Sequence, residues 1–267
     1  MIELIQQQFR ENMSVNDKLN ITREFLQILA LKIMSEKRMF GYLAFVGGTA
    51  LRILFDLKRF SEDLDFSSTK EDKMDIAVFN EQLVKSFSLY GLALETKVKA
   101  EGNVQNIMMK FSSLLKELGL SELDRQKLSI KIEIDTNPPC GWKTINTIVN
   151  KIYMINIVHY DLSSLFAGKL HACFFRKFTK GRDFYDFVWY IGRKVKPNFT
   201  LLNNAIEQTE SISSGVNEGN FKQFLLERVK TIDFDQAKKD VERFLEDKAE
   251  LAIFDQRLIA DTIERTY

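Results

Sequence analysis

The feature that most constrains the fold of this 267-residue chain is a short apolar run that stops at two glycines. The run from Leu43 to Val46 is typical of a buried strand, and Gly47 and Gly48 follow it directly. A helical spacing of apolar residues begins next, and Thr49 is predicted to cap that helix. Glycines at such a turn let the backbone approach a ligand, and the amides at the helix start favour an anion. The sequence therefore predicts a strand–turn–helix unit that can receive a phosphate.

Two carboxylates follow this unit on a second predicted strand. Asp63 and Asp65 are two residues apart, which in a strand places them on one face, about 6–7 Å from each other along the backbone. Leu64 and Phe66 then point to the opposite face, into a core. Two carboxylates on one face repel each other unless a cation lies between them. Because Mg²⁺ takes oxygen ligands from one or two carboxylates and from substrate phosphates, this pair predicts a magnesium site.

Two further carboxylates lie on a strand that is predicted over residues 128–135. Isoleucines alternate there with polar residues, so that one face is apolar and the other carries Lys131, Glu133 and Asp135. Either acidic residue can complete the set with the first two. Glu133 is preferred because it is central in the strand, whereas Asp135 lies near its end. The alternative is that Lys131 and Glu133 simply form a solvated sheet face.

These segments resemble a known family. Residues 47–52 (Gly-Gly-Thr-Ala-Leu-Arg) joined to residues 59–66 (Arg-Phe-Ser-Glu-Asp-Leu-Asp-Phe) resemble the AbiEii/AbiGii toxin family, within the nucleotidyltransferase fold shared with DNA polymerase β. Downstream, a lysine on a helix followed by Arg-Asp-x-x-Asp is also similar to that family, and Lys169, Asp183 and Asp186 match its positions. The resemblance covers residues 43–66 and 130–190.

The resemblance implies both a fold and an activity. We expect an α+β protein with a polymerase β-like domain over residues 1–160, including an N-terminal helical cover, and a mostly helical domain over 161–267 that contributes to the cleft. The implied activity is Mg²⁺-dependent transfer of a nucleotide from an NTP to an acceptor hydroxyl, with the 3′ end of a tRNA as a candidate acceptor. A separately encoded antitoxin is the implied partner.

The resemblance and the chemistry together assign roles to the candidate residues. The metal would be held by three carboxylates, Asp63, Asp65 and Glu133, with Asp135 as the alternative third ligand. The β- and γ-phosphates of the nucleotide would be received by Gly47, Gly48 and Thr49, and Arg59 and Ser61 would add contacts to the nucleotide at the strand entrance. Lys169 would neutralise the triphosphate, and Asp183 or Asp186 would orient Lys169 or contact the base or ribose. An interhelical ion-pair network is the alternative for these last three residues.

Composition limits the remaining possibilities. Thirty-eight basic and 37 acidic residues leave a net charge of +1, so an RNA contact would have to rely on a local basic patch. The first residues lack the pattern of a signal peptide, no apolar window suits a membrane span, and the two cysteines have no paired spacing. We therefore expect a cytoplasmic protein. Two rival functions remain, an enzyme of this fold with a small-molecule acceptor and a non-catalytic module that binds NTP or another protein.

The rest of the chain predicts a mixture of helices and strands. Helices are expected within 1–40, with a cap at residues 14–17, and over 71–90. A hairpin is expected over 93–111 with its turn at 101–103, and a further strand over 152–158. From residue 162 onward the pattern is helical.

Overall fold

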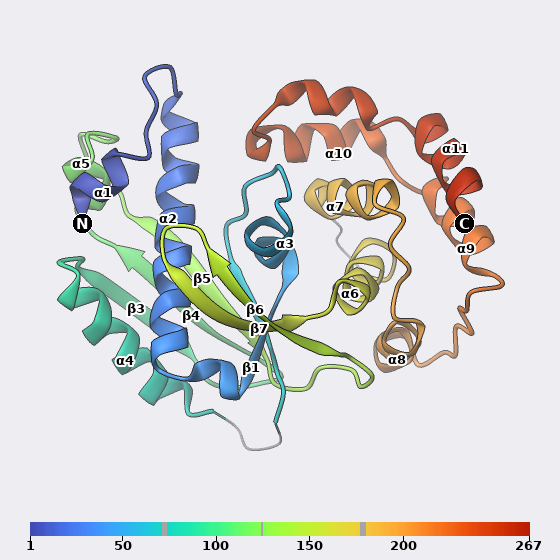
Figure 1. Cartoon of the computed structure of the whole chain (residues 1–267), viewed down its shortest axis with the longest axis horizontal. Helices are drawn as coiled ribbons and strands as arrows, with labels where there is room; N and C mark the ends of the chain where they lie inside the picture. Colours follow the sequence, from blue (N-terminus) through green and yellow to red (C-terminus); the bar gives the residue numbers. More distant parts are fainter. Residues whose placement is uncertain (71–73, 124, 177–179) are drawn as a thin grey trace. The chain divides into compact units, whose positions relative to one another are not determined.

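The computed structural model describes residues 1–70, 74–123, 125–176 and 180–267 (Figure 1). The chain divides into two compact units. The N-terminal unit comprises residues 1–54, 60–137 and 146–159, and the C-terminal unit comprises 55–59, 138–145 and 160–267. Two short segments that precede the predicted boundary at residue 160, namely 55–59 and 138–145, thus belong to the C-terminal unit.

A seven-stranded mixed sheet, in the order β3-β4-β5-β2-β1-β7-β6, organises the N-terminal unit. Its strands are β1 (Leu43–Val46), β2 (Leu64–Ser68), β3 (Leu94–Lys99), β4 (Val104–Phe111), β5 (Leu128–Asp135), β6 (Thr144–Asn150) and β7 (Met154–Tyr160). The pairs β3/β4, β4/β5 and β1/β2 are antiparallel, whereas β2/β5 and β1/β7 are parallel. The predicted α+β class is confirmed, as is the predicted hairpin, which is β3 and β4.

Helices accompany the sheet. They are α1 (Ile2–Gln6), α2 (Val15–Glu36), the 3₁₀ turn η1 (Met39–Gly41), α3 (Gly47–Phe55), α4 (Ile76–Leu89) and α5 (Leu114–Glu117). The predicted cap of α2 is confirmed, because the Ser14 hydroxyl accepts from the Asp17 amide while the Asp17 carboxylate accepts from the Ser14 amide. Helix α4 begins later than predicted, after an Asp75 cap. Residues 71–73, where that helix was expected to start, lie outside the described residues.

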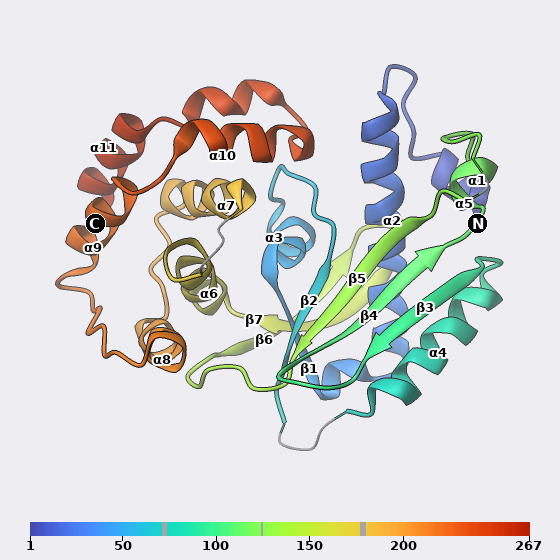
Figure 2. The ribbon, with the colours of Figure 1, turned by 180° about the vertical axis from the view of Figure 1, so that it is seen from behind.

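The two faces of the β3–β4–β5 part of the sheet differ in burial. Helix α2 lies across one face, as Figure 1 shows, and α4 packs against β3. The side chains on that face, such as Ile107, Ile132 and Phe111, are fully buried. Figure 2 looks onto the opposite face of these strands. The side chains on that face are mostly polar and are exposed or half-buried. This second face carries the predicted carboxylates of β2 and β5.

The C-terminal unit is built from helices. They are α6 (Leu162–Phe174), α7 (Gly181–Gly192), α8 (Phe199–Glu210), α9 (Phe221–Val229), α10 (Phe234–Val241), the 3₁₀ turns η2 (Glu242–Phe244) and η3 (Lys248–Ile253), and α11 (Gln256–Thr266). Helix α7 packs so closely on α10 that a Cβ on Gly181 would lie only 2.4 Å from the carbonyl oxygen of Ala237. Stacked rings of Phe166 and Tyr190, with centroids 4.4 Å apart, join α6 to α7. The helical prediction for this part of the chain is confirmed.

Among the described residues, no helix combines the length and the apolar character that crossing a bilayer demands.

Candidate active site

The glycine turn between β1 and α3 lies directly against a predicted metal ligand. Gly47 has a φ of +78°, a backbone conformation that side chains with a Cβ rarely adopt. A Cβ at this position would stand 2.3 Å from Oδ2 of Asp65, because Val46 and Asp65 pair across β1 and β2. Glycine is therefore needed here both for the turn and for the space that the Asp65 carboxylate occupies.

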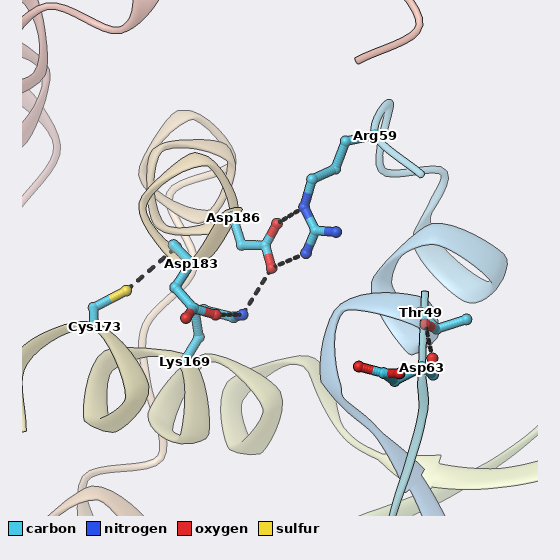
Figure 3. Close-up of polar contacts among 7 residues, drawn as sticks. All are labelled: Thr49, Arg59, Asp63, Lys169, Cys173, Asp183 and Asp186. Atoms are coloured by element: carbon cyan, nitrogen blue, oxygen red, sulfur yellow. Dashed lines mark hydrogen bonds and ion pairs between the residues drawn. The ribbon is translucent and has the colours of Figure 1, made fainter. Parts of the chain in front are cut away.

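The prediction that Thr49 caps α3 is wrong. The helix already begins at Gly47, so Thr49 lies inside its first turn and is buried. Its hydroxyl donates a hydrogen bond to the backbone carbonyl of Asp63, as Figure 3 shows. Thr49 thus ties the start of α3 to the residue that precedes β2. The apolar spacing alone could not locate the helix start, because a glycine with positive φ replaced the usual cap.

The parallel pairing of β2 with β5 places the carboxylates relative to one another. Asp65 pairs with Glu133, and Ser67 pairs with Asp135. Residues paired directly across neighbouring strands have their side chains on the same face. Glu133 is therefore the acidic residue of β5 that lies beside Asp65. Asp135 lies two residues further along and accepts a hydrogen bond of 2.9 Å from the Asn137 amide.

Lys131 contributes a cation to this face. Its ammonium forms an ion pair of 3.0 Å with the Glu133 carboxylate, and both side chains are about one-third exposed. Partial burial opposes the charge, but Glu133, Asp63 and Asp65 together raise the pKa of Lys131 above its ordinary value. The sequence pattern treated Lys131 only as part of a solvated face. Its position two residues before Glu133, on the same face, was the signal that connects it to the site.

The donor set on this face suits a hard divalent cation. Asp63, Asp65 and Glu133 offer only carboxylate oxygens, the ligand type that Mg²⁺ prefers, and the Lys131 ammonium already responds to all three charges. In the described part of the chain, no three such side chains are drawn together tightly enough to form a complete metal cage. A magnesium site at Asp63, Asp65 and Glu133 therefore stays a prediction.

A second cluster of predicted residues lies in the C-terminal unit. The Lys169 ammonium on α6 contacts Asp183 at 2.6 Å and Asp186 at 2.8 Å, both from α7 (Figure 3). The Arg59 guanidinium makes two hydrogen bonds of 2.6 Å to the Asp186 carboxylate. All four side chains are buried, with Asp186 fully inaccessible. The expected alternative of an interhelical ion-pair network is thus present, and Arg59 extends it.

Burial and charge shift the pKa values in this cluster in opposite senses. Burial alone would raise the pKa of Asp183, but the adjoining Lys169 ammonium lowers it to about 2. Burial likewise opposes a charge on Lys169, yet Asp183 and Asp186 raise its pKa above the ordinary lysine value. Both groups are therefore charged at neutral pH. Cys173 is buried beside them, where its thiol donates to the Asp183 carbonyl and burial raises its pKa, so it is a poor nucleophile.

The structure thus groups the predicted residues into two sets, each within one unit. The N-terminal unit contains Gly47, Gly48, Thr49, Ser61, Asp63, Asp65, Glu133 and Asp135, and the C-terminal unit contains Arg59, Lys169, Asp183 and Asp186. The Ser61 carbonyl accepts a hydrogen bond from Gln27 of α2, which fixes the segment before β2. The nucleotide contacts expected of Ser61, Arg59, Lys169, Asp183 and Asp186 stay predictions.

Comparison with known proteins agrees with the fold and with the motifs. A family model described as nucleotidyl transferase AbiEii toxin, type IV TA system, matches residues 29–258. The crystal structure of JHP933 from Helicobacter pylori is similar over 92% of this chain and 94% of its own, with 19% identity and a TM-score of 0.56. A crystal structure from H. pylori that is named provisionally as a nucleotidyltransferase is similar over 92% and 97%, with 18% identity and a TM-score of 0.56. No curated protein matches in sequence.

Proposed function

Because the chain belongs to the AbiEii nucleotidyl transferase toxin family, we propose that it transfers a nucleotide from an NTP to an acceptor hydroxyl, with Mg²⁺ held by Asp63, Asp65 and Glu133. The observation that carries this proposal is the register of β2 and β5, which sets Glu133 directly beside Asp65. The same register favours Glu133 over Asp135 as the third carboxylate. Both carboxylate strands have buried opposite faces, so the site is anchored on a rigid sheet.

The residues of the glycine turn have a complementary task. The backbone amides of Gly47 and Gly48 begin α3, and amides at a helix start bind anions such as the triphosphate. Gly47 brings this turn against Asp65, so phosphate and carboxylate ligands meet at one place. Bound Mg²⁺ would neutralise the triphosphate and lower the pKa of the attacking hydroxyl. The chain's own share is to position the reactants, which is most of what phosphoryl-type transfer requires.

We further propose an RNA 3′ end, such as that of a tRNA, as the acceptor, and a separate antitoxin as the partner. The family's description as a toxin of a toxin–antitoxin system supports the antitoxin. The exposed and half-buried polar side chains of β3 and β4, on the same face as Glu133, support an acceptor larger than a small molecule.

The test is incubation of the protein with Mg²⁺, total tRNA and each of four NTPs labelled at the α-phosphate, beside an Asp65→Asn variant. Label on RNA only with the unaltered protein would support the proposal and identify the nucleotide. Pyrophosphate release with small hydroxyl compounds but no label on RNA would overturn the RNA acceptor. Absence of Mg²⁺-dependent NTP binding would overturn the transferase itself.

Gly47→Ala is expected to reduce transfer strongly, because the new Cβ would displace the Asp65 carboxylate. The matched control is Gly91→Ala, since Gly91 also has a positive φ but has open space where a Cβ would stand. Both variants should lose about 1–2 kcal/mol of folding free energy from the left-handed backbone. Only Gly47→Ala should lose activity in the labelled-NTP assay. Equal activity of the two variants would show that Gly47 does not position Asp65.

A further inference from the structure

The open face of β3, β4 and β5 carries a regular pattern of charge. Strand pairing aligns its residues in three rows: Glu95–Lys110–Ser129, Lys97–Met108–Lys131 and Lys99–Asn106–Glu133. Asp65 extends the third row, because it pairs with Glu133 on the far side. The lysines therefore share one face with the proposed metal ligands and lead up to them across the sheet.

Two lysines of this face are available for a ligand, whereas Lys110 lies beside Glu95 and Lys131 is paired with Glu133. Lys97 and Lys99 are exposed and Lys110 is half-exposed, and in the described residues neither Lys97 nor Lys99 lies in an ion pair. The acidic residue of the first row, Glu95, is paired with Lys127 at 2.6 Å. The part of this face that lies on β3 and β4 is thus locally basic, although the whole chain has a net charge of only +1.

Protection of a sheet edge explains only part of this pattern. Lysines on an edge strand such as β3 discourage pairing with other chains. Lys110 and Lys131, however, lie on the inner strands β4 and β5. The other edge strand, β6, contains no charged residue, so the chain does not defend its edges by charge in general.

The geometry suits an extended polyanion with one end at the carboxylates. Lys99 and Glu133 lie in one row two strands apart, a separation of about 10 Å at the usual strand spacing. A few unpaired nucleotides can span that distance. No aromatic side chain lies in the three rows, so lysine–phosphate contacts rather than base stacking would provide the binding.

We propose that Lys97, Lys99 and Lys110 bind the phosphates of a single-stranded RNA end and direct its terminal hydroxyl toward Glu133. This inference rests on the proposed nucleotidyl transfer and specifies the acceptor site for it. The contacts are made to the backbone, so binding depends on charge and little on base sequence. Lys131 lies on β5, between the lysines of β3 and β4 and the Asp65 carboxylate of β2. The last phosphate of the acceptor and the NTP would approach each other there.

The test compares two triple variants that each remove three positive charges. The first is Lys97→Gln, Lys99→Gln and Lys110→Gln, and the matched control is Lys37→Gln, Lys85→Gln and Lys151→Gln, which are exposed lysines outside these rows. Affinity for a labelled 12-nucleotide RNA is measured by fluorescence anisotropy at several KCl concentrations with constant Mg²⁺. NTP binding is measured separately by calorimetry without RNA, and thermal unfolding checks that each variant folds.

The triple variant of Lys97, Lys99 and Lys110 is expected to bind RNA at least tenfold more weakly at 100 mM KCl, while the control variant binds like the unaltered protein. Its slope of log affinity against log salt should fall by about 2, because each single-strand phosphate contact contributes about 0.7. Equal RNA affinity of both variants would overturn the inference. So would loss of antitoxin binding with unchanged RNA affinity, which would mark the face as a protein interface. Absence of NTP binding in the unaltered protein would instead remove the proposed function.

Discussion

Asp65→Asn is expected to lower nucleotide transfer by about 10³-fold or more while leaving the protein folded. Asp65 lies between Gly47 of the turn and Glu133 of β5, so its carboxylate is central to the proposed metal site. A metal ion supplies several kcal/mol of transition-state stabilisation, and each 1.36 kcal/mol corresponds to a factor of ten in rate. Asparagine keeps the shape of the side chain but removes the charge that binds the cation.

The matched control is Asp135→Asn on the same face of β5. Asp135 lies opposite Ser67 rather than Asp65, and asparagine can still accept the hydrogen bond from the Asn137 amide. We expect this variant to keep most of its activity, and Glu133→Gln to lose it. Rates are measured with labelled NTP at saturating Mg²⁺. The free energy of unfolding of each variant should stay within about 1 kcal/mol of that of the unaltered protein. If Asp135→Asn were inactive and Glu133→Gln active, Asp135 would be the third ligand.

Asp186→Asn is expected to destabilise the C-terminal unit by about 3 kcal/mol or more. Asp186 is fully buried. Its carboxylate accepts hydrogen bonds from Arg59 and forms an ion pair with Lys169. Removing its charge leaves two buried cations with Asp183 as the remaining anion of the cluster. Breaking a buried pair by removing one partner usually costs about 3–5 kcal/mol, because the charge that remains cannot be solvated.

Urea unfolding followed by tryptophan fluorescence measures this loss. Both tryptophans, Trp142 and Trp189, belong to the C-terminal unit, so the signal reports on that unit. Glu218→Gln is the control, since Glu218 pairs with Lys196 in an exposed ion pair, which solvent screens and which we expect to contribute little to stability. If both variants lost a similar amount of unfolding free energy, burial of the Asp186 cluster would add nothing to the stability of the C-terminal unit.

The buried cluster also affects how variants of Lys169 should be interpreted. Lys169 matches the family's lysine, and its ammonium is held by Asp183 and Asp186. A Lys169→Met protein that is inactive could therefore have lost its local fold rather than a contact to the triphosphate. Activity should be compared with the tryptophan-monitored stability of the same variant before a direct role is assigned.

The parts of the molecule that could be predicted from sequence are those determined by local periodicity and glycine. The alternation in β5 predicted both its buried isoleucines and the face of Glu133, and Gly47 marked the turn after β1. The choice between Glu133 and Asp135 depends on the register with β2. Register is a non-local property, and the two strands are separated by helix α4, the β3–β4 hairpin and helix α5.

Other features depend on contacts that no local pattern encodes. Arg59 and Asp186 are 127 positions apart, and nothing in either segment indicates that they meet. Strand β6 was not predicted, because its polar and apolar residues do not alternate regularly and it is mostly exposed. The strand predicted over 152–158 begins two residues late as β7, since residues 152–155 are all apolar or aromatic and mark no boundary.

The pairing of strands also has a consequence for the order in which the protein is made on the ribosome. Asp65 is translated early, but its neighbour Glu133 is synthesised only after α4, the β3–β4 hairpin and α5, roughly 3–14 s later at ordinary rates of synthesis. Strand β1 waits longer still for its parallel partner, because Phe45 pairs with His159. A nascent chain therefore cannot assemble the carboxylate face until half of it has been synthesised, which delays any activity in the cell that translates it.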